Sequence, residues 1–286
     1  MPVMRHATRA NLARSMLFMG SLAVPAASVS AAEPARWPAN VAASYRLYFN
    51  GFDVGKYQFQ STFNGKVYTA TSNASISALF GAFTWKGQIA SSGQLDPAKP
   101  KPMRYQLTFK SKSKEGSVTL GFDKDAIKSV ALVPNKKPNP EAVPVKEADL
   151  KGVFDPMSAI LAMTHAGGGK PCERTIPIFD GKSRFNLIMS YKGEQKIADK
   201  NAPGGSGRLV VCNVKYQPIA GHKPKDFQNP WVDYDGMEIA LRPVPQAHTF
   251  VPYKVTIPTT LGSAVMSAEQ VTITSADKTQ IALTQK

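Results

Sequence analysis

Hydrophobic and polar residues alternate along most of the chain. The alternation begins at Ser44 and returns in short segments separated by turn residues such as Asn50-Gly51 and Asp180-Gly181. Because successive strand residues point to opposite faces, this period of two predicts half-buried antiparallel strands. The expected strands cover residues 44–49, 56–63, 67–76, 84–94, 103–110, 118–122, 127–133, 174–179, 185–191, 209–216, 237–241, 250–257 and 271–273.

One stretch follows a helical period instead. Asp155 is a preferred N-cap residue, and Pro156 suits the first helical position. The apolar residues that follow fall at i, i+3, i+4 and i+7: Met157, Ile160, Leu161 and Thr164. They share one face of a short helix, and this face needs a sheet to cover it. We therefore interpret this stretch as structural rather than catalytic.

Two proline-containing segments, 96–102 and 134–151, are expected to be loops, because proline cannot donate to a strand ladder. The pattern predicts a mainly β fold. We expect one large antiparallel, strongly curved sheet over residues 44–286, either a barrel or a half-open spiral, with one short helix packed in its concave face. The alternative is two β subdomains split near residues 134–151.

The first residues differ from the rest of the chain. A positive segment with several arginines precedes an apolar run at 15–27, which is too short to span a bilayer, and small residues follow at 29–31. This pattern predicts a signal peptide at 1–31, an extended leader at 32–43 and a periplasmic location. No later stretch is apolar for about 18 residues, so no transmembrane span is expected in the mature chain.

The charge indicates the class of partner. The formal net charge is +15. For an exported protein this charge favours envelope lipids, lipoproteins or anionic envelope polymers as partners, and it makes nucleic acid a poor candidate. A solvated surface that is simply basic is the alternative. The basic strand end at Lys110, Lys112 and Lys114 suggests a protein-binding scaffold module as a further alternative.

Two cysteines, Cys172 and Cys212, stand in a chain expected to enter an oxidising compartment. An even number of cysteines there predicts a disulfide, and two allow a single intramolecular connectivity.

Little in the sequence indicates catalysis. It holds no Gly-x-Ser-x-Gly elbow and no closely spaced His or Cys pair of the zinc type. We therefore predict no catalytic residue, no metal and no cofactor. Carboxylates that converge in space remain possible for glycoside hydrolysis. Asp233 and Asp235 are the candidates for such a polar site, and they would make the chain a hydrolase of envelope glycans.

A binding role is the favoured hypothesis. A curved sheet with aromatic residues on its inner face encloses an apolar cavity unless a helix fills it. The expected lining residues are Tyr45, Phe49, Tyr57, Phe59, Tyr105, Phe109 and Phe185. The alternative is that they form a packed core. We expect a non-enzymatic periplasmic β-protein of cell-envelope maintenance, with an acyl chain or lipoprotein segment in its concave face.

Three stretches resemble the exported bacterial family catalogued as domain of unknown function 3108. Residues 45–59, with Val54-Gly55, resemble its opening motif, and residues 154–161 are similar to its Asp-Pro-Leu-Ser helix. Cys172, residues 179–185 and Cys212 match its proteobacterial branch. The resemblance covers residues 44–275 and implies an envelope location and a β-rich fold, but no activity, because the family has none assigned. In overall plan, the chain also resembles periplasmic curved-sheet proteins that carry lipoproteins or support envelope integrity.

Overall fold

The computed structural model describes residues 37–96, 99–135, 139–165, 170–198, 206–224 and 235–284, together with Met1. The expected signal peptide, except Met1, and the first part of the expected leader lie outside the described residues, as does Asp233. Residues Pro34–Lys286 belong to one compact unit.

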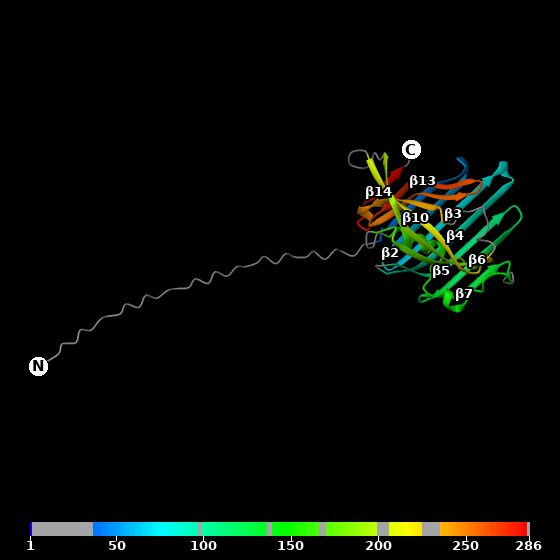
Figure 1. Ribbon diagram of the computed structural model, residues 1–286, viewed down its shortest axis with the longest axis horizontal. Coiled ribbons are helices and arrows are strands. Elements are labelled where there is room, and N and C mark those ends of the chain that lie inside the picture. Colours follow the sequence, from blue (N-terminus) through cyan, green and yellow to red (C-terminus); the bar gives the residue numbers. More distant parts are fainter. Residues whose placement is uncertain are drawn as a thin grey trace. The chain divides into compact units, whose positions relative to one another are not determined.

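The described residues form one antiparallel sheet of 14 strands (Figure 1). The first half contains β1 (Asn40–Phe49), β2 (Phe52–Asn64), β3 (Val67–Ala78), β4 (Phe83–Leu95), β5 (Pro100–Ser111), β6 (Glu115–Asp123) and β7 (Ala126–Val133). The second half contains β8 (Arg174–Phe179), β9 (Arg184–Ala198), β10 (Ser206–Ala220), β11 (Met237–Val244), β12 (Thr249–Thr259), β13 (Gly262–Thr274) and β14 (Gln280–Thr284). Short 3-10 turns are η1 (Leu79–Gly81), η2 (Glu147–Leu150) and η5 (Pro245–Ala247).

The strand order joins the two halves through the N-terminal strand. Neighbours follow the order β7-β6-β5-β4-β3-β2-β1-β13-β12-β11-β10-β9-β8, and β14 pairs with β13. Tyr45 of β1 stands opposite Tyr57 of β2 on one side and Ala268 of β13 on the other. The meander predicted from the alternation is therefore continuous through both halves.

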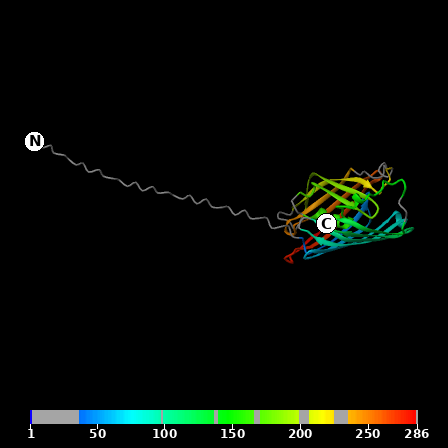
Figure 2. The same ribbon diagram turned by 90° about the horizontal axis from the view of Figure 1, so that it is seen from below.

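The sheet is strongly curved but not closed. Figure 2 shows the strands of the first and second halves facing each other. No ladder joins the described residues of the outermost strands β7 and β8. Instead, the chain before the helix crosses this seam: Gly152 N donates to Asp125 O at 2.7 Å, and Phe154 N donates to Pro177 O at 2.9 Å.

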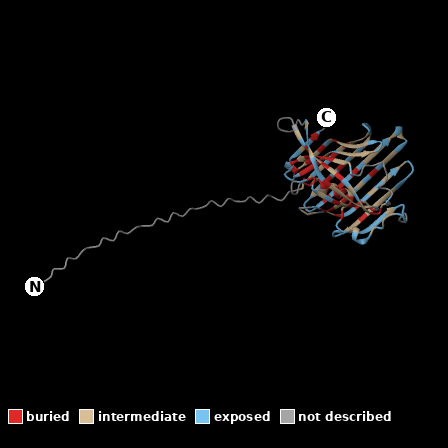
Figure 3. Cartoon of the chain, viewed as in Figure 1, coloured by how far each residue is buried: buried red, intermediate tan, exposed pale blue. Residues whose placement is uncertain are grey.

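Helix α1 (Pro156–Thr164) lies inside the curve, where it contacts β3, β4, β5, β8 and β12. The predicted mainly β fold with one helix in the concave face is confirmed. No helix within the described ranges has the length and apolarity needed to span a membrane. The buried residues gather inside the sheet and around the helix (Figure 3).

Several strand boundaries differ from the prediction. β9 extends to Ala198, β13 begins at Gly262 rather than at residue 271, and β14 is not among the expected strands. β1 begins at Asn40 rather than at Ser44, because residues 40–43 pair with both β2 and β13. β5 begins at Pro100, inside the segment expected to be a loop. The ladder between β5 and β6 stops at the pair Arg104–Gly121, so the start of β5 has a neighbour on one side only, where proline is tolerated.

Candidate functional site

A buried polar cluster holds the helix in place. Asp155 is its N-cap, and the carboxylate accepts hydrogen bonds from Met157 N and Ser158 N, both at 3.0 Å. Ser158 Oγ and Ser91 Oγ also donate to this carboxylate. Tyr68 Oη lies 2.6 Å from Ser158 Oγ. These contacts connect the first turn of α1 to β3 and β4. We call Tyr68, Ser91, Asp155 and Ser158 the Asp155 cluster.

The Asp155 cluster is sealed inside the protein. All four side chains are buried, and Asp155 and Ser158 have no exposed surface. Burial raises the pKa of Asp155, and the hydrogen bonds from Ser158, Ser91 and Met157 N oppose this rise. Burial likewise raises the pKa of Tyr68. Because the cluster is sealed from solvent, it offers no access to a substrate.

This shift predicts how stability depends on pH. A carboxyl whose pKa is raised on folding binds its proton more tightly in the native state. Below the pKa of the unfolded chain, about 4, both states hold the proton and the raised pKa contributes its full stability. At higher pH the unfolded chain releases the proton first, so this contribution is lost as pH rises through the folded pKa. The Asp155→Asn variant should lose this component. Urea unfolding of the unmodified chain and the variant, from below about pH 4 upward, would measure the free energy of unfolding of each. A difference between the two free energies that stays constant with pH would contradict the prediction.

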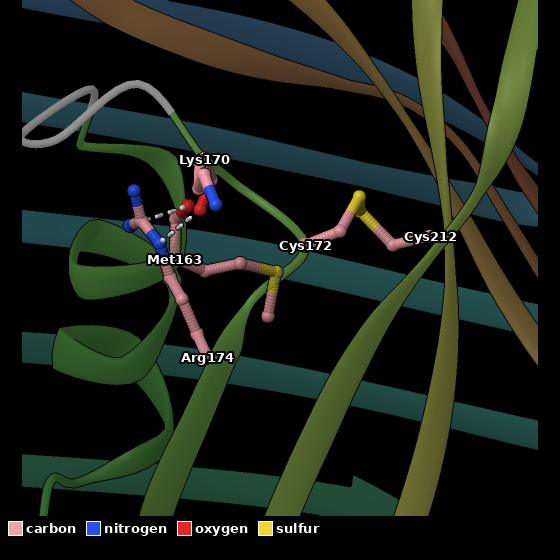
Figure 4. The surroundings of a disulfide bond; sticks show 5 residues. All are labelled: Met163, Lys170, Cys172, Arg174 and Cys212. Atoms are coloured by element: carbon pink, nitrogen blue, oxygen red, sulfur yellow. Dashed lines mark hydrogen bonds between the residues drawn. A yellow bond between two sulfur atoms is a disulfide. The ribbon is translucent and has the colours of Figure 1, made fainter.

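A disulfide holds the segment that follows the helix. Cys172 is bonded to Cys212 of β10, with the Cα atoms 5.2 Å apart, as predicted. Nearby, Arg174 Nη1 donates to Ala162 O at 2.9 Å and to Met163 O at 3.4 Å, at the C-terminal end of α1 (Figure 4). The two ends of the helix are therefore fixed by different means: the Asp155 cluster at the start, and Arg174 beside the disulfide at the end.

An apolar cavity of about 340 Å³ lies between the helix and the junction of the two halves of the sheet. This volume is in the range of small-molecule sites, roughly 300–1,000 Å³. Its walls come from β1, β2, β9, β10, β11, β12, β13 and one face of α1. The central lining residues are Ala43, Tyr45, Tyr57, Phe59, Ile160, Leu161, Phe250, Val251, Val271 and Ile273.

Stacked rings line one end of the cavity. Trp37 lies parallel to His165, with 4.1 Å between ring centroids, and stacks on Phe63 at 5.4 Å. Beside them, Thr249 Oγ1 donates to Thr164 O at 3.0 Å. The polar atoms of these two threonines are thus bonded within the protein, and this end presents mainly apolar surface.

The lining is partly exposed at the other end. Tyr216, Met237, Ile257 and Met266 are partly exposed lining residues that lie toward the turn between β12 and β13. Glu238, which also borders the cavity, is paired with Lys192 of β9. The lining residues at this end are therefore partly in contact with solvent.

The structure brings together some of the predicted aromatic residues and separates the others. Tyr45, Tyr57 and Phe59 line the cavity, and the rings of Tyr45 and Tyr57 are 5.9 Å apart. Phe185 stacks on Tyr216 at 4.6 Å behind the lining. The remaining three are outside the lining: Phe49 at the end of β1, Tyr105 in the core near Asp155, and Phe109 against Gly116. Sequence reasoning missed Trp37, which fell within the expected leader.

The structure describes only one of the two candidate hydrolytic carboxylates. Asp233 lies outside the described residues. Asp235 forms an ion pair with Lys215 at 3.2 Å on the surface. In the ranges that the structure describes, no three His, Cys, Asp or Glu side chains gather in a way that could hold a metal ion.

Comparison with known proteins identifies the family of the chain. One solved structure that resembles it is the crystal structure of a beta-barrel-like protein of domain of unknown function DUF1849 from Brucella abortus, with 10% sequence identity and a TM-score of 0.47. The match covers 84% of this chain and 99% of that one. No curated protein matches the sequence at a significant level. The family model described as "Protein of unknown function (DUF3108)" matches residues 44–269, so the chain belongs to the DUF3108 family.

Proposed function

We propose that this chain is a non-enzymatic periplasmic binding protein of cell-envelope maintenance, which holds the acyl chain of a lipid or lipoprotein in the cavity. The apolar cavity of about 340 Å³ carries the proposal, because its walls are mainly aliphatic and aromatic side chains. Such a surface gains free energy by burying hydrocarbon, at roughly 25 cal/mol per Å² of apolar area.

The shape of the cavity supports an elongated ligand. The lining follows β1 from Val41 to Tyr45 and β12 from Thr249 to Ile257, so it extends along the strands. The Trp37 stack lies at one end, and the lining residues near the β12–β13 turn lie at the other. An acyl chain inserted from the partly exposed end would leave its polar head group in water.

The direct test is the identity of any ligand. The protein would be purified from the periplasm and analysed by native mass spectrometry, followed by lipid extraction. We expect a co-purifying mass that extraction identifies as an acyl lipid. A protein that carries no ligand and also fails to bind a fluorescent fatty acid would overturn the proposal, and recovery from the cytoplasm alone would overturn the location.

Filling the cavity should block binding. Ala43 lines it and is buried, whereas the adjacent Ala42 points to the outer face and is exposed. We expect Ala43→Phe to weaken the binding of a fluorescent fatty acid at least about tenfold, because the added ring occupies the ligand volume. Ala42→Phe is the matched control and should bind as the unmodified chain does. Equal affinities of the two variants, both shown to be folded by their unfolding transitions, would argue against this cavity as the site.

A further inference from the structure

The turn between β3 and β4 exposes large apolar side chains in an unfavourable backbone conformation. Leu79 is 77% exposed and Phe80 is fully exposed, and both have positive φ, at 52° and 53°. Asparagine and glycine are preferred at such positions, and the β1–β2 turn has them at Asn50 and Gly51. Leucine and phenylalanine here cost stability without packing against anything, which indicates a role outside the fold.

Other exposed apolar residues lie at the same end of the sheet. Because the strands are antiparallel, the β1–β2, β3–β4, β5–β6 and β12–β13 turns share one end, and Figure 1 shows the first two of these turns there. Phe52 is 76% exposed beside the β1–β2 turn, and Leu261 is 60% exposed in the β12–β13 turn. Asn50 Nδ2 donates to Leu261 O at 2.6 Å and thereby ties these two turns together. We call Phe52, Leu79, Phe80, Phe83 and Leu261 the apolar tips.

A row of basic residues crosses the outer face of the sheet behind the apolar tips. The pairing register aligns Arg46 with Lys56, Lys56 with Ser75, Ser75 with Lys86, and Lys86 with Lys110. Lys86 and Lys110 thus stand directly opposite each other, although like charges in this arrangement destabilise a sheet. Lys110 is paired with Glu115, and Arg46 is paired with Asp53 and Glu269, whereas neither Lys56 nor Lys86 forms an ion pair with a described carboxylate.

The spacing between tips and basic row matches a lipid interface. Phe83 and Lys86 are three residues apart on β4, which is about 10 Å at a strand rise of about 3.3 Å per residue. Interfacial proteins bury apolar side chains roughly 5–10 Å deep, while lysines nearby contact anionic head groups. We propose that this end of the sheet docks on an anionic lipid bilayer, with the apolar tips inserted and the basic row at the phosphates.

This surface goes beyond the proposed function and does not depend on it. The partly exposed end of the cavity lies toward the β12–β13 turn, and therefore toward the same end of the sheet. A docked protein would thus present its cavity to the bilayer. The Ala43→Phe variant should keep its affinity for vesicles even where it loses the fatty acid, so failure of one proposal is distinguishable from failure of the other.

Vesicle co-sedimentation of the full chain tests the surface. Vesicles of phosphatidylglycerol with phosphatidylcholine would be compared with vesicles of phosphatidylcholine alone, at low and high salt. Replacing Leu79 and Phe80 together by asparagine should lower partitioning to the anionic vesicles at least about tenfold. Asparagine tolerates positive φ, so the turn should keep its conformation. Lys56→Gln and Lys86→Gln should each cost about fivefold and together reduce the salt dependence.

Matched controls come from the opposite end of the sheet. Lys66→Gln lies at the β2–β3 turn, and Met103→Gln replaces an exposed apolar residue near the start of β5. Both should partition as the unmodified chain does. Residues 1–36 are the same in every variant, so a difference in vesicle partitioning between two variants reports the substituted residues. The proposal is overturned if all variants bind vesicles equally, or if the Leu79 and Phe80 replacements leave vesicle binding unchanged but abolish self-association or capture of a protein partner.

Discussion

Replacing Asp155 by alanine should lower the free energy of unfolding by about 3–4 kcal/mol. The change removes an N-cap, which typically costs about 1 kcal/mol. It also leaves two backbone N–H groups and the hydroxyls of Ser91 and Ser158 without their buried acceptor, at roughly 1–3 kcal/mol for each donor left unsatisfied. The two hydroxyls can still bond to each other, so the full sum is not expected. Urea unfolding followed by circular dichroism would measure the loss.

Asp180→Ala is the matched control for this prediction. Asp180 also accepts two backbone N–H groups, from Lys182 at 2.8 Å and Ser183 at 2.6 Å, but in a turn that water reaches. Its removal should cost about 1 kcal/mol or less, because water replaces the lost acceptor. If the two variants lose similar stability, burial of the Asp155 cluster contributes little, and our account of how the helix is held is wrong.

Removing the disulfide should have a comparable effect. Cys172 and Cys212 are 40 residues apart in sequence, and a cross-link that closes a loop of this length contributes about 3–4 kcal/mol in the chain-entropy model. We expect the Cys172→Ala/Cys212→Ala double variant to lose this amount in urea unfolding. Alanine is chosen because both cysteines are buried, and a serine hydroxyl there would need a partner.

Reduction supplies an independent check of the same bond. A reductant should bring the unmodified chain close to the stability of the double variant and leave the double variant unchanged. Two free thiols in the mass of the non-reduced protein, or a transition that does not respond to the reductant, would show that the bond does not form in solution.

The sequence predicted those parts of the fold that depend on local pattern. Alternation identified the strand faces, because one face of each strand is buried here. Asp155 and Pro156 marked the helix start, since a cap and a fixed φ act within one turn. The two cysteines left a single pairing to predict. The predicted strand boundaries were wrong where contacts with neighbouring strands determine them. Pro100 can begin β5 because the ladder with β6 does not extend that far, so no hydrogen bond to β6 is needed there.

The cavity could be predicted only in part. Alternation tells which aromatic residues face inward, but it does not tell whether another element already covers them. Tyr105 faces inward like Tyr45, yet it lies under the start of the helix, whereas Tyr45 lies beyond the helix and remains at the cavity. That difference depends on where α1 crosses the sheet, which is set by Ser91 and Tyr68 from distant strands. A signal was present in Ser158, a polar residue in the first turn of a mainly apolar helix.

The pairing of β1 with β13 determines when the chain can complete its fold. Arg46 and Glu269 are 223 residues apart in sequence, and they meet across this pair of strands at 2.8 Å. Such a contact raises the contact order of the fold, and proteins dominated by distant pairings fold slowly. While the chain is synthesised from its N-terminus, the side of β1 that pairs with β13 remains an open edge until residues 262–274 are available. An open edge invites pairing with other chains, and the pairing of β1 with residues 262–274 removes that opportunity.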